Sequence, residues 1–159
     1  MWYKTALRGH KTYYDFNDLS YELIQTEDSD ESDESDRDPS ERRMRWISYV
    51  LKAYDLEDKQ REMPVGKMDF DVSFYFSGRK QLEFKHVRTA DWYEGMGITT
   101  NLYKWLKYNF ENFGNPEWLV SYPINSAAVR IREKILGEPD IKGSLHEYKL
   151  DYSQGKLDI

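Results

Sequence analysis

The sequence contains no cysteine. This absence excludes disulfide frameworks, zinc sites built from thiolates and cysteine nucleophiles, and it is compatible with a reducing compartment. No stretch approaches the roughly 18 consecutive apolar residues of a membrane-spanning helix, and the first residues lack the apolar run of a signal peptide. We therefore expect a cytoplasmic protein that has no membrane partner and whose stability comes from packing.

An excess of positive charge is also lacking. The net charge is -6, and the segment Glu27–Asp38 alone carries -7, so the rest of the chain is nearly neutral. A nucleic-acid partner is therefore not expected. The run Thr26–Ser40 has no large apolar side chain to bury, and its carboxylates repel one another, which predicts an acidic flexible insertion at 26–40.

Aromatic residues, in contrast, are abundant and make up 16% of the 159 residues. They supply much of the apolar area that one core of this size needs, so we expect a single domain over 1–159. The spacing of apolar residues predicts strands at 2–7, 67–76, 81–87, 118–122 and 145–152, and helices at 15–25, 97–113 and 126–136. Residues 45–54 fit a helix as well as a strand, and we favour the strand. The order of elements indicates a mixed α/β domain around one sheet.

The clearest single pattern is the alternation of apolar and polar residues over 67–76, which a turn at 77–80 joins to a second extended stretch at 81–87. If the apolar residues of both strands share one face, directly paired positions sum to an even number and the loop has an odd length. The other face then carries four charged residues, which are Asp69, Asp71, Glu83 and Lys85.

Two glycines stand where a strand hands over to a helix, in the stretch Gly95-Met96-Gly97. Backbone N–H groups can approach an anion closely there, and together with the helix dipole they suit a pyrophosphate, to which Thr99 and Thr100 add hydroxyl groups. The alternative is a purely structural role, in which the two glycines form a tight turn at the start of a helix and bind no ligand. The third glycine of a dinucleotide fingerprint and the ending of a Walker motif are both missing.

Over roughly residues 68 to 152, the order of hairpin, Gly-x-Gly, amphipathic helix, short strand and second helix resembles the GNAT superfamily of acyl-CoA-dependent N-acyltransferases. Gly95 and Gly97 match the two small positions of that family's pyrophosphate motif, whereas Trp92 departs from the basic residue or Gln at its first position. Asn125 and Ala128 match the family's next motif.

The resemblance implies a mixed, mostly antiparallel central sheet flanked by helices, and an acetyl group passed from acetyl-CoA, or another acyl-CoA, to an amine of a small molecule or a protein. It also implies the residues that bind the acyl-CoA, which are Val87, Gly95, Met96, Gly97, Ile98, Thr99, Thr100 and Asn125.

For catalysis, the resemblance implies a general base on the strand before the glycine loop, where Glu83 stands. The alternative for Glu83 is a solvent-facing carboxylate paired with Lys85 or Lys67. The family's usual acid, a Tyr on the second helix, is replaced by Arg132, so Tyr122 is the candidate acid and Tyr108 is a second possibility.

Two other functions stay open at this point. Trp92 and Arg132 also fit a GNAT-like binding or structural protein that has lost the reaction. Asp71, Glu83 and Lys85 resemble the signature of PD-(D/E)xK nucleases, in which two carboxylates hold Mg²⁺. We expect no other metal site, because the three histidines are too scattered to give a recognisable ligand spacing.

Overall fold

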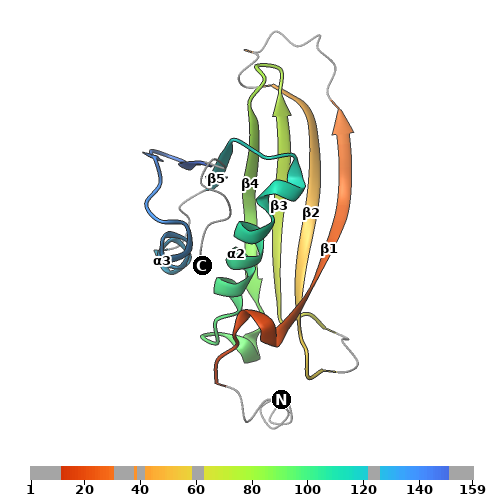
Figure 1. Ribbon diagram of the computed structural model, residues 1–159, viewed down its shortest axis with the longest axis vertical. Helices are drawn as coiled ribbons and strands as arrows, with labels where there is room; N and C mark the ends of the chain where they lie inside the picture. Colours follow the sequence, from red (N-terminus) through yellow and green to blue (C-terminus); the bar gives the residue numbers. More distant parts are fainter. Residues whose placement is uncertain (1–11, 31–37, 39–41, 59–62, 122–125, 151–159) are drawn as a thin grey trace.

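The computed structural model describes residues 12–30, 38, 42–58, 63–121 and 126–150. Along the chain the elements are η1 (Phe16–Asp18), β1 (Leu19–Asp30), β2 (Arg43–Asp55), β3 (Gly66–Tyr75), β4 (Lys80–Thr89), η2 (Asp91–Tyr93), α2 (Ile98–Asn109), η3 (Phe110–Phe113), β5 (Trp118–Ser121), α3 (Ser126–Leu136), β6 (Ile141–Lys142) and β7 (His146–Lys149). The strands form one seven-stranded sheet in the order β1-β2-β3-β4-β5-β7-β6 (Figure 1).

The sheet is mostly antiparallel. β1 to β4 pair as an antiparallel meander, β5 pairs with β7 and β7 with β6 in the same manner, and β4 and β5 are parallel. A parallel pair needs a crossover connection, which α2 supplies. The predicted α+β fold, with a mixed, mostly antiparallel sheet flanked by helices, is therefore confirmed.

One face of this sheet holds the core. Leu82, Leu119 and Tyr148 lie side by side across β4, β5 and β7, and all three are buried with Leu102 and Leu106 of α2. Figure 1 shows α2 crossing β3 and β4, with α3 further along the sheet beyond β5. Both helices contribute apolar side chains to this one core, so α2 and α3 cover the same face.

The hairpin of β3 and β4 has the predicted register. Phe74 pairs with Lys80 and Phe70 with Phe84, so paired positions sum to an even number, as an odd loop length requires. The register then shifts, because Asp69 pairs with His86. The extra residue on β4 at this point is a β-bulge, which bends the strand and increases its twist.

The prediction of a helix at 15–25 is wrong. Only Phe16–Asp18 forms a 3-10 turn, and the chain then enters β1, which pairs with β2 along its whole length. Tyr21 packs toward the core and its ring stacks on Phe16 at 4.9 Å between centroids. The pairing with β2 satisfies the backbone of this stretch, and that long-range interaction overrides a weak local helix pattern.

The beginning of the predicted acidic loop is also part of this strand. β1 continues through Thr26–Asp30, and a bulge lies between Gln25 and Glu27. The expectation of a loop is therefore wrong for these residues. Of the remainder of 26–40, only Asp38 lies within the described residues.

The other predicted elements are confirmed where the structure describes them. Residues 45–54 belong to β2, the helix expected at 97–113 is α2 followed by η3, and the helix expected at 126–136 is α3. β5 and β7 correspond to the last two predicted strands, whereas the two-residue β6 was not predicted. The strand expected at 2–7 lies outside the described residues.

Candidate functional site

The parallel strands β4 and β5 bring two helix N-termini to the same edge of the sheet. Each strand is followed by a helix, and α2 and α3 both pack on the core face. Near their C-terminal ends the helices touch, because the Lys107 ammonium donates to the Ile135 carbonyl at 2.7 Å. The positive ends of two helix dipoles therefore face the carboxyl ends of two parallel strands, which is where open α/β sheets bind ligands.

At this edge β4 and β5 separate. They pair only between Gln81–Glu83 and Trp118–Val120, whereas β4 continues to Thr89. No described strand pairs with residues 84–89 on the β5 side. Val87 lies in this stretch, beyond the bulge, and is part-buried. As far as the described residues show, the backbone of this part of β4 therefore offers its unpaired groups to a ligand.

The start of α2 presents backbone donors that have no acceptor. Gly97 is the N-cap in a left-handed conformation with φ 85, and it provides no side-chain cap. The first helical bond is donated by Asn101 to the Gly97 carbonyl at 3.1 Å. Within the described part of the chain, no acceptor faces the N–H groups of residues 97–100. Four free N–H groups at a helix N-terminus favour an anion.

The hydroxyl groups of the two predicted threonines are used differently. The Thr99 hydroxyl shares a hydrogen bond of 2.9 Å with that of Thr89, which ties the end of β4 to the first turn of α2. Among the described residues, the Thr100 hydroxyl has no such partner. Thr100 is therefore the better placed of the two to donate a side-chain hydrogen bond to a ligand.

An N-terminal segment that the sequence analysis did not single out holds the glycine loop in place. The Tyr14 N–H donates to the Met96 carbonyl at 2.8 Å, and the Asn101 amide donates to the Tyr14 carbonyl at 2.7 Å. Tyr14 is fully buried, and its hydroxyl donates to the Asp55 carboxylate at 2.6 Å. Burial and this carboxylate raise the pKa of the Tyr14 phenol. We call residues 13 and 14 the N-terminal strap.

Tyr13 of the strap lies directly against Gly97. A Cβ atom placed on Gly97 would be 2.6 Å from Cε2 of the Tyr13 ring, whereas one placed on Gly95 would meet nothing within 4 Å. The Tyr13 side chain is 52% exposed. Glycine at position 97 is thus required by its positive φ and by the aromatic ring beside it.

The predicted base Glu83 lies on the other face of the sheet from α2. It pairs with Asp71 of β3 and with Val120 of β5, at the last position before β4 and β5 separate. Lys85, which with Lys67 was an expected alternative partner of Glu83, forms an ion pair with Asp71 at 2.9 Å. The location of Glu83 is therefore compatible with a role at the opening between the strands.

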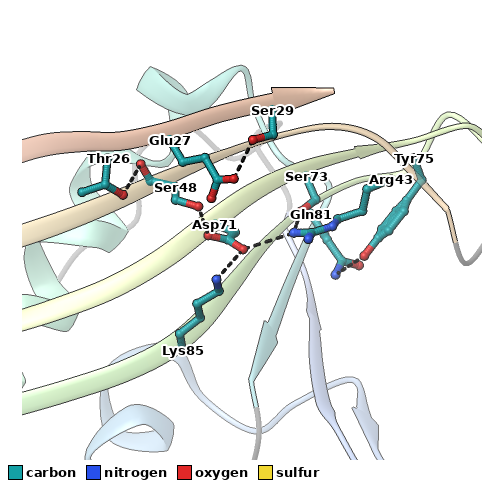
Figure 2. A network of polar contacts seen from close by, with 10 residues as sticks. All are labelled: Thr26, Glu27, Ser29, Arg43, Ser48, Asp71, Ser73, Tyr75, Gln81 and Lys85. Carbon is teal, nitrogen blue, oxygen red and sulfur yellow. Dashed lines mark hydrogen bonds and ion pairs between the residues drawn. The ribbon is translucent and has the colours of Figure 1, made fainter. Parts of the chain in front are cut away.

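Asp71 itself is fully engaged in a polar network (Figure 2). Its carboxylate is only 1% exposed, and it accepts hydrogen bonds from the Ser48 hydroxyl at 2.6 Å and the Arg43 guanidinium at 3.1 Å, besides the ion pair with Lys85. The register places Asp71, Glu83 and Lys85 on one face, as a nuclease would need, but Lys85 neutralises the carboxylate that would hold Mg²⁺. The described residues contain no group of three side chains suited to a metal ion.

A second polar cluster surrounds Arg132 of α3, a residue that the sequence analysis noted only as a departure from a motif. Its side chain is 1% exposed and donates to the Ser121 hydroxyl at 2.6 Å, to Nδ1 of His146 at 2.7 Å and to the Tyr148 hydroxyl at 3.4 Å. Among the described residues no carboxylate lies within 4.0 Å of it. A buried guanidinium that has only neutral hydrogen-bond partners is uncommon, because buried charges are usually paired.

Two predicted site residues, Tyr122 and Asn125, lie outside the described residues. Of the others, the structure brings Gly95, Met96, Gly97, Ile98, Thr99 and Thr100 together in one loop and helix start. Met96 contributes less than expected, because its carbonyl binds Tyr14 and its N–H donates to the Tyr93 carbonyl at 3.3 Å. The free donors therefore begin at Gly97.

No protein-family model and no curated protein sequence matches the chain. Among solved structures, three similar folds are GNAT acetyltransferases. The first is a protein assigned as a phosphinothricin N-acetyltransferase, with 16% sequence identity, a TM-score of 0.47, and coverage of 65% of this chain and 68% of that chain. The second is yncA of Salmonella typhimurium, assigned as an acetyltransferase and solved with acetyl-CoA, with 16% identity, a TM-score of 0.48, and coverage of 70% of each chain. The third is a chimera of the spermidine N-acetyltransferase SpeG of Vibrio cholerae and hSSAT, with 18% identity, a TM-score of 0.40, and coverage of 64% of this chain and 63% of that chain. At these identities and TM-scores, function has to be argued from the site itself.

Within the described residues, none of the helices combines the length and apolar character that crossing a membrane requires.

Proposed function

We propose that the protein is an N-acyltransferase that binds an acyl-CoA, most simply acetyl-CoA, and passes the acyl group to an amine. One observation carries this proposal: the N–H groups of residues 97–100 have no acceptor among the described residues, and they lie beside the carboxyl end of β4, where Thr89 contacts Thr99. Such donors suit a pyrophosphate, which offers several negatively charged oxygens to a helix N-terminus.

The residues at this edge fit an acyl-CoA in three respects. The strap bonds to the Met96 carbonyl and leaves the free N–H groups of α2 unused. The Thr100 hydroxyl adds a donor in the same turn. The unpaired side of β4 around Val87 offers backbone groups to an extended chain such as the pantetheine arm. Asn125 is also proposed to bind the acyl-CoA, because it matches the second GNAT-like motif of the sequence.

The acyl-CoA supplies a thioester whose acyl group an amine can take up directly. In this proposal Glu83 removes a proton from the ammonium group of the acceptor, directly or through one water molecule, because it is the carboxylate at the point where β4 and β5 separate. Tyr122, the residue that follows β5, is proposed to return a proton to the leaving thiolate. The acceptor is an amine of a small molecule or of a protein.

The first test is calorimetry with acetyl-CoA, followed by thiol release in the presence of a panel of amines. Glu83→Gln is expected to lower turnover by about 10²- to 10⁴-fold, the usual range for loss of a general base, with nearly unchanged affinity for acetyl-CoA. Glu117→Gln is the matched control, because this exposed carboxylate lies at the other end of β5 from the separation of the strands. Full activity of Glu83→Gln would place the base elsewhere.

A second candidate function is that of a protein that binds acyl-CoA but does not transfer its acyl group. The buried Arg132 favours this alternative, since it stands where the resemblance implies a catalytic Tyr and it is fully occupied by neutral partners. Such a protein would bind acetyl-CoA in the calorimeter and release no thiol with any amine. Absence of acetyl-CoA binding would contradict both candidates.

A further inference from the structure

The Arg132 side chain joins three elements at the edge where the proposed reaction takes place. It extends from α3 to Ser121, the last residue of β5, and to His146, the first residue of β7. Ser121 directly follows the stretch of β5 that pairs with β4 up to Glu83. The end of β5 is therefore held by the backbone pairing of Ser121 with His146 and, through the Ser121 hydroxyl, by this buried guanidinium.

The contact with His146 fixes the protonation state of that residue. A guanidinium can only donate hydrogen bonds, so Nδ1 of His146 must accept, and the imidazole is neutral with its proton on Nε2. Protonation would place a second N–H opposite the Arg132 donor and a second positive charge beside it. The bond of 2.7 Å between Arg132 and His146 cannot survive that change.

The surroundings of His146 also favour its neutral form. Arg132 of α3 and Lys142 of β6 are the nearby cations, and the carboxylates of Glu133 and Glu138 act in the opposite direction. Both carboxylates are already held by Lys142, at 3.4 Å and 3.2 Å. Burial is the largest effect, and the net result is that the pKa of His146 is lowered.

The remaining groups that face this cluster are phenols and a hydroxyl. Tyr148 of β7 accepts from Arg132 at 3.4 Å, and Tyr103 of α2 interacts with the same guanidinium. Burial raises the pKa of both phenols, so they stay uncharged around neutral pH. Among these groups, His146 is therefore the one that changes charge between neutral and mildly acidic pH.

We infer that Arg132 is a positioning residue, which holds the end of β5 against α3 as long as His146 is neutral and releases it when His146 takes up a proton. The effect on turnover rests on the proposed function, because it acts on the strand that borders the reaction site. The coupling between His146 and the end of β5 does not depend on that function and can be measured separately.

The experiment compares the unmodified protein with three variants. His146→Asn keeps an acceptor oxygen near the place of Nδ1 but does not titrate, and Arg132→Gln removes the charge while keeping a donor. His86→Asn is the matched control, because His86 is an exposed histidine on β4. The measurements, each as a function of pH, are the imidazole resonances, the backbone amide resonance of Ser121, and the kcat and KM for acetyl-CoA.

Ser121 pairs directly with His146, so its amide responds to some extent to the charge on the imidazole alone. We expect the Ser121 resonance to shift over the pH range in which His146 titrates in the unmodified protein and in His86→Asn, to shift much less in Arg132→Gln, and not to shift in His146→Asn. Below that titration kcat should fall by up to about tenfold per pH unit while KM for acetyl-CoA stays nearly constant. Arg132→Gln should raise the pKa of His146.

Glu83 and the acceptor amine give an acid limb of their own, so the diagnostic quantity is the change in that limb. A Ser121 resonance that does not follow the titration, one that follows it equally in Arg132→Gln, or an acid limb of kcat with the same midpoint and steepness in His146→Asn as in the unmodified protein would overturn the inference. Absence of turnover at every pH, together with a Ser121 resonance that follows His146, would refute the transferase proposal and still support the coupling.

Discussion

Replacing Gly97 by alanine should destabilise the protein more than replacing Gly95, although both glycines have positive φ, 85 and 75. An alanine in this left-handed region costs about 1–2 kcal/mol at either position. At Gly97 the new Cβ would also lie 2.6 Å from Cε2 and 2.7 Å from Cζ of Tyr13, so the ring has to move. Such overpacking costs about 1–3 kcal/mol, and the lower part of this range applies because Tyr13 is half exposed and can swing outward. We expect a loss of about 1–2 kcal/mol for Gly95→Ala and about 2–4 kcal/mol for Gly97→Ala.

Urea unfolding of both variants measures this difference, and the restriction of the unfolded chain by alanine cancels between them. Tyr13→Ala alone and the double variant Tyr13→Ala/Gly97→Ala complete a double-mutant cycle, which isolates the interaction between the ring and the new Cβ. Without the ring, alanine at position 97 should cost no more than alanine at position 95. Equal losses for the two glycine variants, or a double variant that is not relieved, would refute the role assigned to the strap.

Three further predictions concern stability. Gly66→Ala should cost about 1–3 kcal/mol in urea unfolding, because its Cβ would lie 2.6 Å from Cγ2 of Ile98 in the first turn of α2. Tyr14→Phe should cost about 1–3 kcal/mol in the same assay, since it leaves the Asp55 carboxylate without its buried phenol donor. The lowered pKa of His146 means that the unfolded chain binds its proton first as the pH falls below about 6.5, so stability present above that pH should decline on acidification. Thermal unfolding between pH 5 and 8 should show a smaller decline for His146→Asn, and an unchanged slope would contradict this assignment.

The hairpin of β3 and β4 illustrates what could be predicted from the sequence. Alternation over 67–76 determines which side chains share a face, and the requirement that both apolar sets meet determines the parity of the register. The bulge that follows could not be predicted, because Lys85 and His86 are both polar and give no periodic signal. The turn at Gly95 and Gly97 could also be predicted, because glycines between a strand and a helix favour a tight turn there. Both glycines have positive φ in the structure, as such a turn requires.

The stretch 15–25 and the strap show why other features could not be predicted. A helical spacing of only a few apolar residues is a weak indication of a helix. The pairing of β1 with β2 gives most of this stretch its strand conformation instead. Tyr13 and Tyr14 carry no motif, and their contacts with Gly97 and Met96 join parts of the chain that are far apart in sequence. Arg132 was visible as an unexpected residue in a motif, but only the structure identifies its neutral partners.

The strap also has a consequence for the order in which the protein folds. The hydrogen bond from Asn101 to the Tyr14 carbonyl spans 87 residues, and the meander of β1 to β4 lies between its ends. Closing so long a loop costs chain entropy that must be offset by contacts made earlier, so pairings of this range tend to form late. During synthesis Tyr14 emerges long before Gly97 does, and for that interval the segment has no glycine loop to bind. The start of α2 should therefore reach its final shape only after the four strands have paired, and it should be among the first parts to lose that shape when the protein begins to unfold.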